Sequence, residues 1–209
     1  MLIQNGLGVE KPFYKAFPGT PVISGVAYLP TTQISPASFV HSEMETLHLG
    51  LYPSAPASQP LERFAELIRL GGATAKIHHD IQSQRWRKIV ANGAVNPICA
   101  LSRCRDELIQ LSPCLGEALF EDVMQEIASV AKSAGYGHIV TPEVVGAQLA
   151  RTLSRPPPGV QPSMMADALE ARPMEVQAVV GEMVQIAGEK GIHIPRLVTL
   201  YVLLKGLNK

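Results

Sequence analysis

Three polar residues in the stretch WRKIVANGAVNP are spaced so that they could act together. Lys88, Asn92 and Asn96 lie four residues apart, so on a helix they form one stripe, with about 5 to 6 Å between neighbours. Asparagine is unfavourable inside helices and more common in caps and turns. In one reading Lys88 is solvated and Asn96 ends the helix before Pro97. In the other reading the stripe lines a cleft, where one ammonium and two amides bind a polar, oxygen-rich ligand.

The cleft reading gives the lysine a chemical role. An ammonium that is partly desolvated beside neutral amides has a lowered pKa and can donate a proton near neutral pH. The spacing alone leaves both readings of Lys88 open.

A second group of polar residues lies in SMMADALEARPME. Ser163 follows Pro162 and begins a predicted helix, where serine commonly serves as the N-cap. The amides of a helix N-terminus also favour an anion such as a carboxylate, so a cap and a ligand contact are compatible. Glu175 follows Pro173 at the start of the next predicted helix, where it is either a first-turn carboxylate or a site residue.

Other stretches predict no further site. The glycines of GLG at 6–8 are followed by Lys11 where a dinucleotide fingerprint needs its last glycine, and GxGxxG occurs nowhere in the chain. His78, His79 and Asp80 are adjacent, so in a strand they point to opposite faces and do not converge on a metal. The single tryptophan, Trp86, is expected to anchor a core.

The elements that would position these residues change in kind near residue 80. Short β-leaning runs at 20–30, 34–42 and 45–53, a helix over 61–70 that stops at Gly71, and a strand over 73–79 predict the end of an α/β domain. Asp80 is a fair N-cap. Long helices follow, separated by a proline-rich loop at 154–162, and are expected over 81–95, 113–135, 142–154, 163–171, 174–191 and 196–207. We therefore expect two domains, 1–79 and 80–209.

Composition narrows the class of partner. Eighteen Lys and Arg balance eighteen Asp and Glu among 209 residues, so no overall field would attract nucleic acid or an anionic membrane. No basic and apolar leader begins the chain, and no apolar run approaches the roughly 20 residues that span a bilayer. Three irregularly spaced cysteines argue against a disulfide framework. A cytoplasmic protein is expected.

The motifs QNGLG, WRKIVANGAVNP and SMMADALEARPME, in this order, resemble the ketopantoate reductase (2-dehydropantoate 2-reductase) family. The resemblance continues through GIHIPRLVTLYVLLK and covers nearly the whole chain. It implies a Rossmann-type domain followed by a helical domain, with the substrate between them. Residues 1–79 would then be the C-terminal remnant of the Rossmann domain, and 80–209 the helical substrate domain.

The resemblance also implies an activity and residue roles. The family reduces 2-dehydropantoate to pantoate with NADPH, in the pathway to pantothenate and coenzyme A. A 2-oxo acid is thus the expected substrate, and a homodimer is possible because a broken sheet favours association. The matching positions are Lys88 as general acid, Asn92, Asn96 and Ser163 as substrate contacts, Asn5 between nicotinamide and substrate, and Glu175 on the cofactor and substrate side.

Two departures from the family pattern keep other functions open. The family has QNG late in its Rossmann domain, whereas this sequence begins there, so we expect an N-terminally truncated member that binds NADPH poorly or not at all. Val176 and Gln177 also depart from the pattern after the family glutamate. The alternatives are a cofactor-less module for binding or oligomerisation, and a reductase of another 2-oxo acid.

Overall fold

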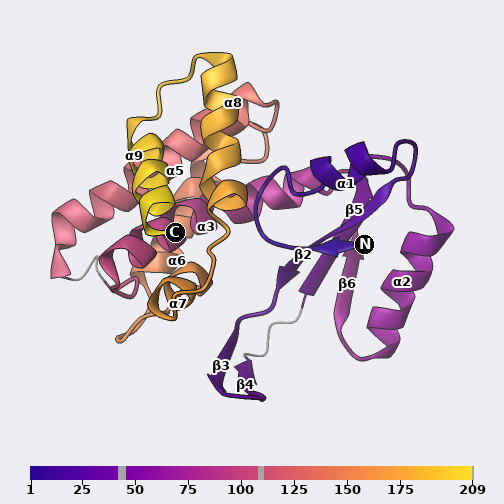
Figure 1. Ribbon diagram of the computed structural model, residues 1–209, viewed down its shortest axis with the longest axis horizontal. Helices are drawn as coiled ribbons and strands as arrows, with labels where there is room; N and C mark the ends of the chain where they lie inside the picture. The colour runs from indigo at the N-terminus through magenta and orange to yellow at the C-terminus, as the bar shows by residue number, and fades with distance from the viewer. Residues whose placement is uncertain (42–45, 108–110, 209) are drawn as a thin grey trace. The chain divides into compact units, whose positions relative to one another are not determined.

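A computed structural model describes residues 1–41, 46–107 and 111–208. The chain forms two compact units, Met1–Arg85 and Trp86–Lys209. Figure 1 shows a small sheet with few helices in the first unit and a bundle of helices in the second. The two-domain prediction placed its boundary at 79/80, six residues before this division.

A four-stranded mixed sheet is the centre of the first unit. Its order is β1-β2-β5-β6, with β1 (Leu2–Ile3) parallel to β2 (Val22–Tyr28), β2 antiparallel to β5 (Thr46–Tyr52), and β5 parallel to β6 (Thr74–Ile77). Helix α2 (Gln59–Leu70) places Leu61 and Ala65 against Leu49, Leu51 and Ala75 of the sheet. The predicted strands at 20–30 and 73–79 and the helix before Gly71 are confirmed.

Two elements of the first unit differ from the sequence prediction. The β-leaning run at 34–42 is not one strand. It contributes to β3 (Thr31–Ser35) and β4 (Ser38–His41), which form a separate hairpin, because the chain turns at Ala37, whose φ is +61°. Ser42 and Glu45, which belong to predicted runs, lie outside the described residues. A short helix, α1 (Lys11–Ala16), was not predicted.

Helices make up the regular structure of the second unit within the part of the chain that the structure describes. Helix α3 (Gln82–Ser102) runs into this unit from the first, and α5 (Pro113–Ser133), α6 (Pro142–Leu153), α7 (Ser163–Leu169), α8 (Glu182–Lys190) and α9 (Pro195–Leu207) follow. The predicted helices are confirmed apart from two details. A π-helical segment, η1 (Gln177–Gly181), leads into α8. Pro97 was predicted either to end or to kink the first of these helices, and α3 does not end there.

Packing explains why α3 continues past its proline. Pro97 removes one backbone hydrogen bond and crowds the carbonyl four residues before it, but residues 93–100 are all buried. Gly93 is in close contact with other helices, because a Cβ added there would lie 2.9 Å from Ile127 Cδ1 and 2.9 Å from Met183 Cε. Burial of this face therefore outweighs the local cost of the proline.

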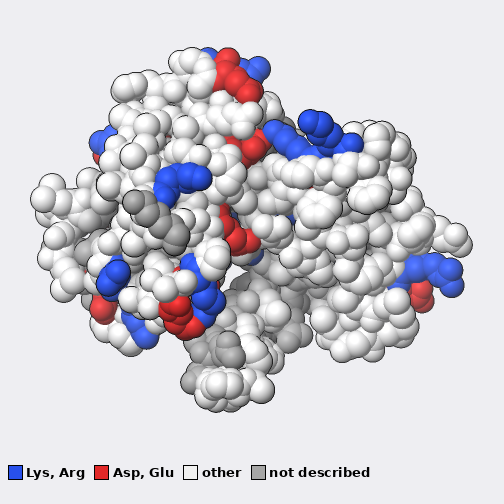
Figure 2. Space-filling view, viewed as in Figure 1, with Lys and Arg blue, Asp and Glu red and all other residues white. Residues whose placement is uncertain are grey.

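On the face drawn in Figure 2, basic and acidic side chains lie in small groups of both signs. Among the described residues, no helix is both long and apolar enough to cross a bilayer.

Candidate functional site

The polar stripe of α3 lies on one unbroken helix of the second unit. Lys88 and Asn92 are half-buried, and Asn96 is 8% exposed. Because α3 continues to Ser102, Asn96 does not end the helix, and that part of the solvated reading is wrong. Burial increases along the stripe, so its amides are progressively shielded from bulk water.

Ser163 is the first residue of α7 and is exposed. The residue in the N-cap position is Pro162, with the extended backbone angles φ −65° and ψ 155°. Ser163 therefore begins the helix, as predicted, but it does not occupy the N-cap position, so the reading of Ser163 as the cap is wrong. Its hydroxyl is not committed to a cap.

The proline-rich loop before Ser163 is tied down by a buried aspartate. Asp106, 2% exposed, accepts hydrogen bonds from Arg155 Nη1 and from the backbone N–H of Val160 at 2.6 Å. Gly159 has a φ of +72°, and a Cβ there would lie 2.4 Å from Asp106 Oδ1. The glycine is thus required where the loop passes the carboxylate.

Glu175 lies just before the π-helical segment and is half-buried. Its carbonyl accepts a hydrogen bond from Val179 N–H at 2.9 Å. In the segment that follows, the Gln177 side chain covers Gly181, and Tyr201 Oη donates to Gln177 Oε1 at 3.0 Å. Short π-helices occur frequently at functional sites. Sequence patterns missed this segment, for which only Gly181 was a signal.

Asn5 belongs to the first unit, in the turn between β1 and α1, and is half-buried. The turn needs two glycines in the left-handed region, because φ is +93° at Gly6 and +70° at Gly8. Asn5 thus lies in the unit Met1–Arg85, whereas the stripe of α3 lies in the unit Trp86–Lys209.

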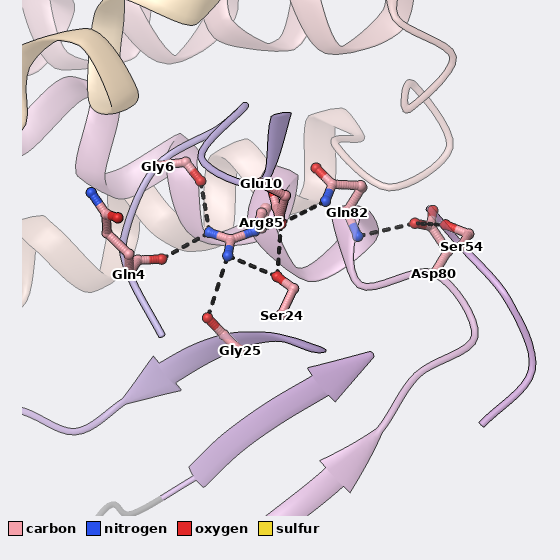
Figure 3. Close-up of polar contacts among 9 residues, drawn as sticks. All are labelled: Gln4, Gly6, Glu10, Ser24, Gly25, Ser54, Asp80, Gln82 and Arg85. Atoms are coloured by element: carbon pink, nitrogen blue, oxygen red, sulfur yellow. Dashed lines mark hydrogen bonds and ion pairs between the residues drawn. The ribbon is translucent and has the colours of Figure 1, made fainter. Parts of the chain in front are cut away.

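Sequence patterns also missed a buried ion pair beside the Asn5 turn. Arg85 Nε lies 2.6 Å from Glu10 Oε1, and the two side chains are 1% and 0% exposed. Glu10 Oε1 also accepts from Ser24 Oγ at 2.7 Å and from Gln82 Nε2 at 2.9 Å. Figure 3 shows the side chains of Ser24, Gln82 and Arg85 converging on Glu10. Within the described residues, Glu10 Oε2 has no hydrogen-bond partner.

The residues of this turn do not fit the pyrophosphate of a dinucleotide. A strand, glycines and a helix follow one another here, but α1 has only six residues, and buried Glu10 is its N-cap. A helix N-terminus binds phosphate through free N–H groups and positive potential, whereas here a carboxylate is placed at that end. With no GxGxxG in the chain, its residues provide no dinucleotide phosphate site of the usual kind.

A pair of histidines joins strand β5 to the residues just after strand β6 in the first unit. His48 Nδ1 lies 2.8 Å from His78 Nε2, and Tyr28 packs edge-on against His48. Burial, and secondarily Lys76, lowers the pKa of His78 below its ordinary value of 6.5. Asp80 accepts from Gln82 N–H and Ser54 Oγ, both at 3.0 Å, as expected for a cap of α3. Over the described residues, no three metal-ligating side chains gather.

The surroundings of the cysteines and of the tryptophan indicate structural rather than chemical roles. Cys99, Cys104 and Cys114 are free thiols, and burial raises the pKa of Cys99 to about 12, so it stays protonated. Trp86 is 3% exposed and stacks on Tyr136 with ring centroids 5.8 Å apart. The prediction of a core tryptophan is confirmed.

The fold and the motifs together define a class of protein in which an α/β unit is followed by a helical unit. Family models identify the class: "Ketopantoate reductase PanE/ApbA" matches residues 1–54 and "Ketopantoate reductase PanE/ApbA C terminal" matches 80–208. The chain belongs to the ketopantoate reductase family, and the sequence-based recognition and fold class are confirmed.

Relatives and solved structures agree with this family. The 2-dehydropantoate 2-reductase of a Nostoc species is 27% identical over 213 residues, which cover 100% of this chain and 65% of the relative. The crystal structure of 2-dehydropantoate 2-reductase from Methylococcus capsulatus has a TM-score of 0.85 and 32% identity, covering 99% of this chain and 64% of that one. The chain thus spans about two thirds of the length of these proteins.

A second solved structure is similar in fold alone. A D-mandelate dehydrogenase in complex with NADH has a TM-score of 0.82 at 19% identity, covering 98% of this chain and 68% of that one. A dehydrogenase with a different name, which holds the nicotinamide cofactor NADH in that structure, therefore shares this architecture.

Proposed function

We propose that this chain carries the substrate-binding and proton-donating part of an NADPH-dependent 2-dehydropantoate 2-reductase. The observation that supports this most is the α3 stripe, in which Lys88 and Asn92 are half-buried and Asn96 is buried on one continuous helix. Family membership supplies the substrate class. Cytoplasmic location and a homodimer are part of the same proposal.

Lys88 is the proposed general acid. As hydride reaches the carbonyl carbon, negative charge develops on the carbonyl oxygen, and an ammonium N–H aimed at that oxygen is most useful in the transition state. The proton passes from Lys88 Nζ to the oxygen, the 2-oxo acid becomes a 2-hydroxy acid, and the neutral amine regains a proton from water. NADPH supplies the hydride in this reaction.

The amides and the hydroxyl are proposed to hold the substrate. Asn92 and Asn96 each offer two N–H donors and one acceptor, which suits a carboxylate and a hydroxyl on the same small molecule. The exposed Ser163 hydroxyl, not used as a cap, is a further donor. Asn5 and Glu175 are proposed for the cofactor side, by resemblance to the family.

NADPH binding is the weak point of the proposed activity. A dinucleotide pyrophosphate is held by a glycine-rich turn of the GxGxxG kind, and GxGxxG does not occur among the 209 given residues. We therefore expect NADPH to bind more weakly than to a family member that has the glycine-rich turn.

Loss of NADPH absorbance with 2-dehydropantoate tests the function. Lys88→Ala is expected to lower kcat by about 10² to 10⁴-fold, the usual contribution of a general acid. Lys190→Ala, at the exposed end of α8, is the matched control and should retain activity. Turnover that survives Lys88→Ala would overturn the assigned role, and absence of turnover with NADPH bound would overturn the function.

A second candidate is a cofactor-less binding or oligomerisation module. The lack of GxGxxG in the given sequence favours it, as do exposed apolar residues of α9, where Val198, Val202 and Leu203 are 42%, 61% and 53% exposed. Titration with NADPH, followed by nicotinamide fluorescence, separates the two functions. Micromolar binding would rule out the module, whereas no binding together with dimers in light scattering would favour it.

A reductase of another 2-oxo acid is the remaining alternative. Gln177, two residues after Glu175, favours this alternative because it departs from the family pattern. Its side chain accepts a hydrogen bond from Tyr201 Oη. Comparing kcat/KM across a panel of 2-oxo acids identifies the substrate, and Lys88→Ala should lower turnover of each.

A further inference from the structure

We propose that Arg85 is a positioning residue, which fixes the Asn5 turn and thereby the direction of the Asn5 side chain. The proposal rests on the function above only in that Asn5 is taken to contact substrate or nicotinamide. Arg85 belongs to neither the motifs nor the stripe from which that function was argued.

The guanidinium bonds to the chain on both sides of Asn5. Arg85 Nη1 donates to the carbonyl of Gln4 at 2.8 Å and to the carbonyl of Gly6 at 2.9 Å. One nitrogen therefore holds the peptide group that precedes Asn5 and the peptide group that follows Gly6. Figure 3 shows Gln4 and Gly6 held by the same guanidinium. Because the short segment from Gln4 to Gly6 is held at both ends, the backbone angles of Asn5 within it are restricted, and with them the direction of its Cα–Cβ bond.

The remaining donors of Arg85 hold the guanidinium itself in place. Nε donates to Glu10 Oε1 at 2.6 Å, and Nη2 donates to Ser24 Oγ at 2.8 Å and to the carbonyl of Gly25 at 3.5 Å. Arginine has five N–H donors in a rigid plane, and each of them has an acceptor here. The turn, strand β2 and the start of α3 are thus joined through one side chain.

Small residues let α3 begin close to the sheet. A Cβ added to Gly50 of β5 would lie 2.8 Å from Ile81 Cβ and 2.8 Å from the His78 carbonyl. Gly50 pairs with Ser24 in the sheet, next to the strand that Arg85 contacts. The close approach brings the first turn of α3 over β2, where a long, planar side chain can reach the Asn5 turn.

Lysine cannot replace this arrangement. It has three donors on a compact ammonium, whereas the five acceptors around Arg85 are spread over a planar fork. Arg85→Lys keeps the charge opposite Glu10 but has to give up some carbonyl contacts. The variant therefore separates charge pairing from turn positioning.

Nuclear magnetic resonance of the Asn5 side-chain amide, together with amide exchange at Gly6 and Leu7, tests the proposal on the whole chain. In Arg85→Lys we expect a shifted or broadened Asn5 signal and exchange at least about 10-fold faster, because an opening made easier by 1.4 kcal/mol is a factor of ten. Arg69→Lys is the matched control. Arg69 donates twice to the Ala75 carbonyl in the same unit, away from the turn, so its loss should leave Asn5 unchanged.

A second variant keeps the proposal testable if the first variant fails to fold. Glu10→Met with Arg85→Met removes both buried charges, so no unpaired charge remains, yet the turn still loses its guanidinium. Leu61→Ala, which destabilises the core of the same unit, controls for stability. Asn5 signals that stay unchanged in both Arg85 variants, or that change equally in Leu61→Ala, overturn the proposal.

Kinetics distinguish failure of the proposal from failure of the function. If the chain reduces 2-dehydropantoate, Arg85→Lys should lower kcat by about 100-fold, as expected for a misplaced contact, while Arg69→Lys should not. An unchanged kcat and KM in Arg85→Lys, in an active chain, overturns the positioning role. A mobile Asn5 turn in the variant, in a chain without reductase activity, upholds the proposal and overturns the function.

Discussion

Two buried carboxylates, one in each unit, hold loops in different ways. Glu10 pairs with Arg85, and their side chains are 0% and 1% exposed. Asp106 pairs with Arg155, and their side chains are 0% and 28% exposed. In the first unit neither partner can turn to water if the other is lost, whereas Arg155 can. The first pair should therefore be the more sensitive to change.

The largest effect is expected from breaking the Glu10 and Arg85 pair. Arg85→Met should lower the free energy of unfolding of the first unit by about 3 to 5 kcal/mol, because it leaves an unpaired buried charge. Amide exchange of β2 and β5 under native conditions measures it. Adding Glu10→Met should restore part of the loss, and a double variant less stable than the single one would contradict this account.

Asp106→Ala should have a smaller effect on the second unit. It removes the charged acceptor of the Val160 N–H, a hydrogen bond worth about 1.5 to 3 kcal/mol, while Arg155 and the exposed Val160 can be solvated. Urea unfolding followed by Trp86 fluorescence measures it, since Trp86 is the single tryptophan and lies in this unit. Asp167→Ala, which removes a more exposed pair with Arg172, is the control. A loss equal to that in Arg85→Met would remove the contrast between the pairs.

The first unit should also be the more sensitive to acid. Folding lowers the pKa of His78 below 6.5, so the unfolded chain binds more protons as pH falls through 6.5. The contribution is fully present above pH 6.5 and is lost below it. Amide exchange of β5 and β6 at several pH values should show this, and His78→Gln should weaken it while His193→Gln should not. Equal acid sensitivity in both variants would assign the effect elsewhere.

The smallest effect is expected at an exposed ion pair. Arg196 Nη2 lies 2.6 Å from Asp122 Oδ2, and both side chains are 46% exposed. Asp122→Asn should change the stability of the second unit by less than about 1 kcal/mol, because water screens exposed pairs. Urea unfolding of the variant measures it. A loss of stability as large as that in Asp106→Ala would mean that the exposure of an ion pair does not determine how much the pair contributes to stability.

Most helices could be predicted because their signals are local. Apolar residues three and four positions apart, and stop residues such as Gly135 with a φ of +91°, lie within one or two turns. The prediction failed where packing outweighed a local preference, as at Pro97 within α3, or where one backbone angle decided the outcome, as at Ala37. The start of α7 at Ser163 agrees with the prediction, whereas the N-cap position falls on Pro162, a difference of one residue that is within the usual uncertainty of helix boundaries.

The sequence by itself determined the family, the two kinds of domain and the polar stripe of Lys88, Asn92 and Asn96, because helical spacing alone places these three side chains on one face. Only the tertiary structure decided what holds Asn5. Arg85 reaches Gln4, Gly6 and Glu10 across 81, 79 and 75 residues of sequence. Periodicity cannot reveal such partners, because it reports neighbours within a few residues and not the fold that brings distant carbonyls to one guanidinium.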